Sequence, residues 1–210
     1  LVIIDEAQRW PETDRIVKGW YDAGLNFKVI LLGSSSLDLL SQTAEALTGR
    51  NEKDFLPPLT FGEILPQEAW FLPNLDQSKI SAVFGAQLES SLLNALAFGS
   101  YPEAVLSVNK ENYLRNLTAD YLLKDVLQIG LIKTPELIKK LLLLLAHQNG
   151  QEVSISEIAT SLGMARLTVE RYLDLLEQTY VIFRLKAWST NPRKEITKSQ
   201  KIFFWDTGIR

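Results

Sequence analysis

Apolar and polar residues alternate in blocks along the first third of the chain, as they do in α/β domains. Residues 1–4 form an unbroken apolar run, which is typical of a parallel strand buried on both faces. Residues 28–32 (KVILL) predict a second buried strand. Residues 13–23 and 37–47 have the spacing of helices, and the prolines within 55–59 predict an extended stretch.

The middle third of the chain, about residues 67–148, has the pattern of a helical region. Helices are predicted near 77–98, 110–128 and 135–148, with glycine and proline between them. The last of these contains five consecutive leucines at 141–145. Because that segment is apolar all round, we expect it to be buried among other helices.

The last third of the chain predicts a short helix over 154–163, a longer amphipathic helix over 165–178, and strands at 180–188 and 201–205. Two helices joined by a tight turn and followed by a β-hairpin are the layout of a winged helix-turn-helix. The residues of the longer helix that we expect to be available to the core are Leu167, Tyr172, Leu175 and Leu176.

Composition excludes several classes of chemistry. The chain has no cysteine and one histidine, His147, which excludes disulfides, thiol catalysis and Cys/His zinc sites. No motif places catalytic partners for His147, so we expect no catalytic role for it. No apolar run approaches the roughly 20 residues that span a bilayer, and no signal peptide opens the sequence. We therefore expect a cytoplasmic protein with no membrane partner.

Charge is distributed unevenly. The net charge of −3 divides into −8 over residues 1–180 and +5 over residues 181–210. A basic end on an acidic body indicates a polyanion contact near the C-terminus, although a lysine-rich solvated loop gives the same pattern. The candidate nucleic-acid residues are Arg193, Lys194, Lys198 and Lys201.

Two acidic residues, Asp5 and Glu6, directly follow the first apolar run. Ligands of open α/β sheets bind outside the carboxyl ends of the strands, so this pair has the position of a Walker B element. Asp5 would then hold Mg²⁺, usually through water, and Glu6 would orient the attacking water. The alternative is a strand that ends in a solvated acidic turn.

Ser34 and Ser35 follow the second apolar run, after Gly33. A polar side chain at this strand end can hydrogen-bond a γ-phosphate or the attacking water. The alternative is a serine-rich turn that caps the next helix.

Several stretches in this order resemble the prokaryotic AAA-superfamily ATPases that carry a C-terminal uncharacterised domain with a winged helix. They are LVIIDEAQRWP, VILLGSSS, ALTGRNEKDFLPPLTFGEIL, GSYPEAV, YLLKDV and KIFFWDTGI. The resemblance implies ATP and Mg²⁺ as cofactors, Asp5 and Glu6 as the Walker B pair, and Ser34 or Ser35 as sensor 1. It also places Arg50 as an arginine finger for a neighbouring subunit, and hence implies self-association; a structural salt bridge is the alternative for Arg50.

The sequence departs from this family in having no G-x-x-x-x-G-K-[ST] phosphate loop. Residues 130–134 (GLIKT) lack the required glycines. In the family the loop precedes Walker B, so we expect the given chain to be a fragment that starts after it and does not bind ATP by itself. The KIFFWDTGIR stretch suggests a cut at the other end too, before a nuclease-like domain that family members often carry. We expect no nuclease activity from this chain.

The sequence thus predicts an α/β fold followed by a helical region and a winged helix-turn-helix. Residues 1–66 would be the C-terminal part of an AAA-type ATPase core, with the phosphate loop missing. Residues 67–148 would be a helical lid or connector, and 149–210 a winged helix truncated at its C-terminus. The predicted function is ATP hydrolysis by the full-length protein. The alternative is a winged-helix module that binds DNA or a protein under control of the ATPase part.

Overall fold

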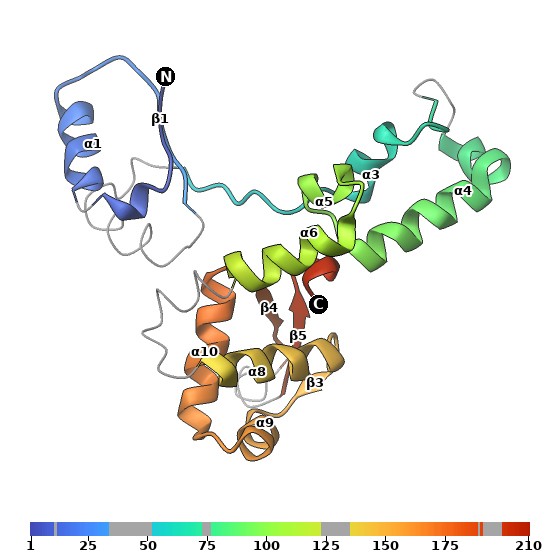
Figure 1. Cartoon of the computed structure of the whole chain (residues 1–210). Coiled ribbons are helices and arrows are strands. Elements are labelled where there is room, and N and C mark those ends of the chain that lie inside the picture. The colour runs from blue at the N-terminus through green and yellow to red at the C-terminus, as the bar shows by residue number, and fades with distance from the viewer. Residues whose placement is uncertain (11, 34–51, 73–76, 123–134, 189, 191–198) are drawn as a thin grey trace.

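The chain folds into an N-terminal unit, a helical middle and a C-terminal unit, which Figure 1 shows from blue to red. This computed structural model describes residues 1–10, 12–33, 52–72, 77–122, 135–188, 190 and 199–210. The helix predicted over 37–47 lies outside these residues.

Two short parallel strands, β1 (Val2–Ile4) and β2 (Val29–Leu31), form the sheet of the N-terminal unit. A single 3₁₀ turn, η1 (Ala7–Arg9), follows β1, and helix α1 (Thr13–Asp22) runs back along the sheet. This is the strand–helix–strand order that the apolar pattern predicts, and a parallel pair requires such a crossover.

The first strand is less buried than its sequence predicts. Leu1 is 73% exposed and Ile3 is 56% exposed, whereas Ala7 and Val17 are buried. Within the part of the chain that the structure describes, this sheet has only two strands, and no second layer covers Ile3. The prediction that both faces of β1 are buried is therefore wrong for the described residues.

The middle of the chain is helical, as predicted, but more finely divided. Its elements are α3 (Phe61–Ile64), η2 (Leu65–Gln67), α4 (Gln77–Phe98), α5 (Pro102–Leu106), α6 (Lys110–Asn116) and the π-helical turn η3 (Leu117–Leu122). The bounds of α4 are those predicted, although its backbone breaks from helical geometry at Phe84. The short helix α3 begins with a capping box, in which Thr60 and Glu63 satisfy each other's backbone N–H groups.

The C-terminal unit combines three helices with a three-stranded antiparallel sheet. In chain order its elements are α8 (Pro135–His147), β3 (Glu152–Val153), α9 (Ile155–Leu162), α10 (Arg166–Gln178), β4 (Ile182–Leu185), β5 (Gln200–Phe204) and the 3₁₀ turn η4 (Thr207–Ile209). Strand β5 lies between β3 and β4.

The main hydrophobic core lies inside this C-terminal unit. Leu141 of α8, Leu173 and Leu176 of α10, and Ile182 of β4 are fully buried in it. Two expectations about these helices are wrong. Leu167 is 76% exposed, because it lies on the face of α10 that also carries the exposed Arg171 and Asp174. Leu143 is 64% exposed, so α8 turns one side outward despite its leucine run.

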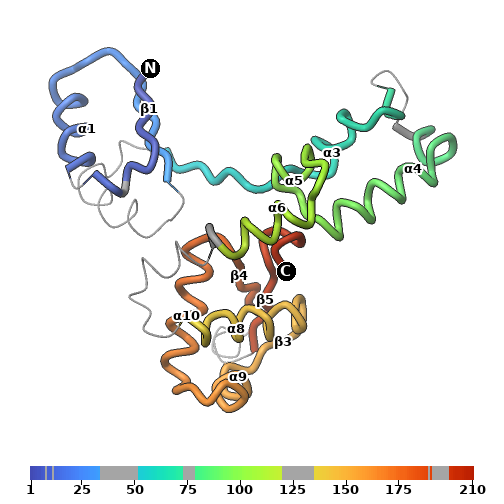
Figure 2. The backbone as a smooth tube through the Cα atoms, in the orientation of Figure 1, coloured from blue at the N-terminus to red at the C-terminus, as the bar shows by residue number. Residues whose placement is uncertain are grey.

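An extended segment, residues 52–60, joins the N-terminal unit to α3. Figure 2 shows it as a long cyan stretch of backbone between the two. The extended conformation predicted over 55–59 is confirmed. Pro57 and Pro58 account for it, since proline restricts both its own backbone and that of the residue before it.

Candidate functional site

The predicted Walker B pair lies at the carboxyl end of β1. Asp5 is exposed, and its Oδ1 accepts a hydrogen bond of 2.9 Å from the backbone N–H of Glu6. The next backbone N–H, that of Ala7, donates to the carbonyl of Leu32 at 2.9 Å, beyond the end of β2. The turn that carries both carboxylates is therefore fixed to the end of the neighbouring strand.

Glu6 has a left-handed backbone conformation, with φ 48° and ψ 42°. Such a conformation is uncommon for residues other than glycine and costs of order 1 kcal/mol or more. The side chain is half-buried, and its Oε2 lies 3.3 Å from Nε of Arg9. The Thr13 hydroxyl donates to the carbonyls of Ala7 and Trp10, which holds η1 in place behind the turn.

Most of the other predicted site residues lie outside the described part of the chain. These are Ser34, Ser35, Arg50, Arg193, Lys194 and Lys198. Lys201 is described. It is exposed on β5, opposite Leu185 of β4 and Glu152 of β3.

The possible ligand atoms at the turn are carboxylate oxygens, which are the kind of ligand that Mg²⁺ prefers. Magnesium is usually held by one or two carboxylates together with the phosphates of a substrate, rather than by a cage of protein ligands. The described residues contain no group of three or more histidine, cysteine, aspartate or glutamate side chains that could hold a metal ion. Asp5 would be the ligand.

The C-terminal unit contains a buried carboxylate that is not among the predicted site residues, that of Asp206, which is 2% exposed. Its Oδ2 accepts a 2.6 Å hydrogen bond from the N–H of Ser100, and its Oδ1 accepts one of 2.7 Å from Gly208. The N–H of Tyr101 contributes a further bond. The Asp206 carboxylate thus accepts hydrogen bonds from backbone N–H groups at the start of α5, and it also caps η4. Burial raises its pKa, and the three N–H donors oppose that rise.

The contact of Asp206 with the start of α5 and with η4, which we call the junction, requires two glycines. Gly99 has φ +73°, and a Cβ there would lie 1.8 Å from Oδ1 of Asp206. A Cβ on Gly208 would lie 2.3 Å from the carbonyl oxygen of Phe98. The only signal for this site in the sequence is that GSYP and WDTG both belong to the stretches that carry the family resemblance. Nothing in their separate patterns places them together.

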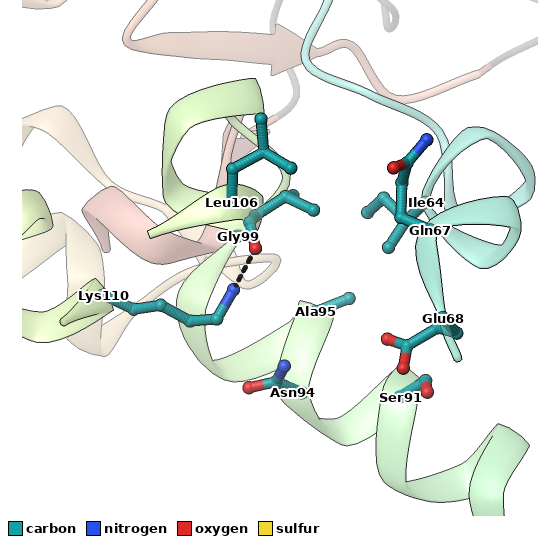
Figure 3. Close-up of a pocket in the computed structure, with 10 residues that line it drawn as sticks. Ile64, Gln67, Glu68, Ser91, Asn94, Ala95, Gly99, Leu106 and Lys110 are labelled. Carbon is teal, nitrogen blue, oxygen red and sulfur yellow. Dashed lines mark hydrogen bonds between the residues drawn. The ribbon is translucent and has the colours of Figure 1, made fainter. Parts of the chain in front are cut away.

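A pocket of about 340 Å³ lies beside the junction, between η2, α4 and α5. Figure 3 shows Lys110 at one end and Glu68 at the other, with Ser91 of α4 beside Glu68 and Asn94 of α4 between the two ends. The Lys110 ammonium donates to the carbonyls of Ala104 and Val105 at 2.7 Å, at the end of α5. Burial lowers the pKa of Lys110, and the charge of Glu68 opposes this.

Comparison with known families divides the chain into two matched regions. Residues 89–210, more than half of the chain, match a family described as a domain of unknown function, DUF8612. The chain belongs to the DUF8612 family. Residues 1–65 match an AAA domain, which supports a P-loop AAA-type ATPase domain in this part of the chain. We refer to these as the DUF8612 region and the AAA region.

Curated relatives share both regions and are longer. An uncharacterised protein of Mycobacterium tuberculosis is 29% identical over 213 residues, which cover 100% of this chain and 43% of that protein. An uncharacterised protein of Haemophilus influenzae is 26% identical over 222 residues, covering 99% and 51%. One of Methanocaldococcus jannaschii is 29% identical over 197 residues, covering 90% and 43%. The chain therefore spans about half the length of these relatives. No solved structure matches it significantly.

Among the described residues, no helix is both long enough and apolar enough to cross a bilayer.

Proposed function

We propose that the full-length protein hydrolyses ATP with Mg²⁺, and that Asp5 and Glu6 of this chain belong to the site. The carrying observation is the acidic turn at the carboxyl end of a parallel strand pair, within the region that matches an AAA domain. Bound Mg²⁺ would neutralise charge on the phosphates. Asp5 would hold the ion, usually through water, and the Glu6 carboxylate would accept a hydrogen bond from the attacking water and orient it.

The geometry around the turn suits these roles. The bond from Ala7 to Leu32 keeps the turn at the edge where the two strands end, which is where ligands of parallel sheets bind. Ser34 or Ser35 would act from the end of β2 as the residue that senses the γ-phosphate. Arg50 would reach the γ-phosphate of a neighbouring subunit, which requires self-association.

The test is a substitution in the full-length protein. Glu6→Gln should lower the turnover of ATP by at least about 100-fold and change its dissociation constant by less than about twofold, because an amide keeps the shape but does not accept the proton. Glu12→Gln is the matched control, since Glu12 is also a surface glutamate paired with an arginine three residues on. Turnover in Glu6→Gln equal to that of the control would remove Glu6 from the mechanism.

The given chain should not bind ATP by itself. It contains no phosphate loop, and that loop supplies the backbone N–H groups that hold the phosphates. Isothermal titration of the 210-residue chain with ATP and Mg²⁺ should give no heat of binding. Micromolar binding would contradict this.

A second function, contact with DNA or a protein through the C-terminal unit, is favoured by the order of its elements. A helix, a strand, two helices and two further strands, with β5 between β3 and β4, are the parts of a winged helix. Helix α10 would be the recognition helix, and the segment between β4 and β5 would be the wing.

Charges on α10 indicate that the wing is the stronger DNA contact. Nε of Arg166 lies 3.0 Å from Glu170 on the same helix, and the neighbouring Leu167 is 76% exposed. A paired arginine and an exposed leucine suit a protein contact better than phosphate binding. The basic residues of the wing proposed to contact phosphates are Arg193, Lys194, Lys198 and Lys201.

Fluorescence anisotropy with random duplex DNA at two salt concentrations distinguishes a DNA partner from a protein partner. Alanine at the four wing positions should weaken binding more than alanine at Arg166 and Arg171, and binding should fall steeply with salt. A stronger effect from the helix pair would mean that α10 enters the groove. No binding at low salt would favour the protein partner.

A further inference from the structure

The extended segment 52–60, which we call the strap, is attached to the DUF8612 region far from its own place in the sequence. The ring of Phe55 packs between two aromatic side chains of the C-terminal unit. Its centroid lies 4.7 Å from that of Tyr180 and 4.5 Å from that of Trp205. The strap belongs to the AAA region, so this contact joins the two matched regions directly.

A second attachment lies four residues further along the strap. The N–H of Leu59 donates to the carbonyl of Ser100 at 2.9 Å. Ser100 is in turn held through its own N–H by Asp206. The capping box of Thr60 and Glu63 then fixes the direction in which the chain enters α3, and these bonds lower the pKa of Glu63. The C-terminal end of the strap is therefore held firmly.

The surface that receives Phe55 is also fixed. The N–H of Trp205 donates to the carbonyl of Val181 at 3.1 Å, and that of Val181 donates to Leu176 at 2.9 Å. Tyr180 has a left-handed backbone, φ 56°, which its neighbours must hold in place. Phe183 lies 4.9 Å from Trp205 between ring centroids and supports it from β4.

The Phe55 contact itself is of a kind that opens and closes easily. Phe55 remains 42% exposed, so its ring loses only part of its contact with water on docking. An aromatic pair at these distances contributes modestly, in contrast to a buried core residue. The strap thus has one firm attachment, at Leu59 and Thr60, and one weak attachment, at Phe55, on the side that leads back to the N-terminal unit.

We propose that the strap transmits the nucleotide state of the AAA region to the DUF8612 region, with the docking of Phe55 on Tyr180 and Trp205 as the step that changes. This rests on the proposed ATPase function. Movement of the AAA region on binding or losing nucleotide would reach the strap through its N-terminal end. Because the other end is held at Ser100, the displacement acts on the Phe55 contact, and through Trp205 on the end of β5.

Hydrogen–deuterium exchange of the full-length protein tests this, measured without nucleotide, with Mg²⁺ and ADP, and with Mg²⁺ and a non-hydrolysable ATP analogue. Exchange of the Trp205 amide should differ by about fivefold or more between the two nucleotide states, whereas exchange of the Leu59 amide, in the firm attachment, should stay the same. Phe55→Ala should raise the exchange of the Trp205 amide about tenfold without nucleotide and abolish its difference between the nucleotide states, whereas Phe55→Tyr should restore the wild-type exchange and the difference. Leu56→Ala is the matched control, because Leu56 is 93% exposed on the same strap.

Nucleotide binding is measured in parallel by titration, which separates the two proposals. If nucleotide binds and the exchange of the Trp205 amide is the same in both states, the coupling is refuted and the ATPase proposal stands. If Phe55→Ala exchanges like Leu56→Ala without nucleotide, the docking of Phe55 is refuted. If no nucleotide binds, the ATPase proposal and the coupling that rests on it both fail.

Discussion

Replacing Asp206 by alanine should destabilise the fold more than any surface change of equal size. The carboxylate accepts the backbone N–H groups of Ser100, Tyr101 and Gly208 and is almost completely buried. Alanine removes the acceptor and leaves those donors inside the protein. Both ends of the junction, the start of α5 and the turn η4, lose their cap together.

The magnitude follows from the number of donors. A buried donor left without a partner costs about 1–3 kcal/mol. Ser100, Tyr101 and Gly208 are half-buried, so we take the lower value for each and expect a loss of about 3 kcal/mol in the free energy of unfolding. For a chain of this size, that lowers the melting temperature by about 6–12 °C. The melting temperature of Asp206→Asn should lie between those of the wild type and Asp206→Ala. In either orientation of the amide, its NH₂ group faces a backbone N–H at Ser100 or Gly208.

Thermal unfolding of the purified chain, followed by circular dichroism, measures this loss. Asp54→Ala is the control, because Asp54 is an exposed aspartate on the strap. A melting temperature for Asp206→Ala within about 2 °C of that control, below the shift expected for 1 kcal/mol, would refute the view that Asp206 holds the junction.

Three further predictions concern the same unit. Gly208→Ala places a Cβ against the carbonyl of Phe98 and should cost about 2–3 kcal/mol in urea unfolding, whereas Gly62→Ala, with no atom within 4 Å, should cost nothing; equal midpoints would contradict this. Burial raises the pKa of Asp206 above its unfolded value, so the folded state keeps this proton to a higher pH than the unfolded state does. The free energy of unfolding of the wild type, relative to Asp206→Asn, should therefore fall as the pH rises from about 4; unfolding curves at several pH values measure it, and a rising difference would count against it. Arg184→Ala removes an arginine that bridges two carboxylates of α10 and should cost about 1–2 kcal/mol in urea unfolding; no loss would show that the carboxylates are solvated equally well without it.

Where the ends of an element are set by local chemistry, the sequence predicted it well. Either Ser154 or Ser156 is of the residue type that begins a helix, and Ser154 accepts a hydrogen bond from the N–H of Glu157 and begins α9. Gly163 ends the same helix in the left-handed conformation, with φ 63°. Helices α1, α4, α8 and α10 also lie within a residue or two of their predicted bounds.

What the sequence did not predict depends on contacts between distant segments. Asp206 and Ser100 are 106 residues apart, and no periodicity links them. Strand β3 has only two residues and exists because β5 pairs with it, so its own pattern is too short to recognise. Each of these outcomes is decided by packing rather than by local propensity.

The C-terminal end of β5 is the place where these long-range contacts meet. Trp205 receives the ring of Phe55, and the next residue, Asp206, holds Ser100, which in turn accepts the N–H of Leu59. Thr207 then donates its hydroxyl to the carbonyl of Ala95 in α4. Three consecutive residues thus contact the strap, the start of α5 and the end of α4. The predicted boundary near residue 148 separates two patterns in the sequence, but these contacts join residues on its two sides. A displacement of the strap would therefore reach α4 and α5 as well as the sheet, without passing through the hydrophobic core.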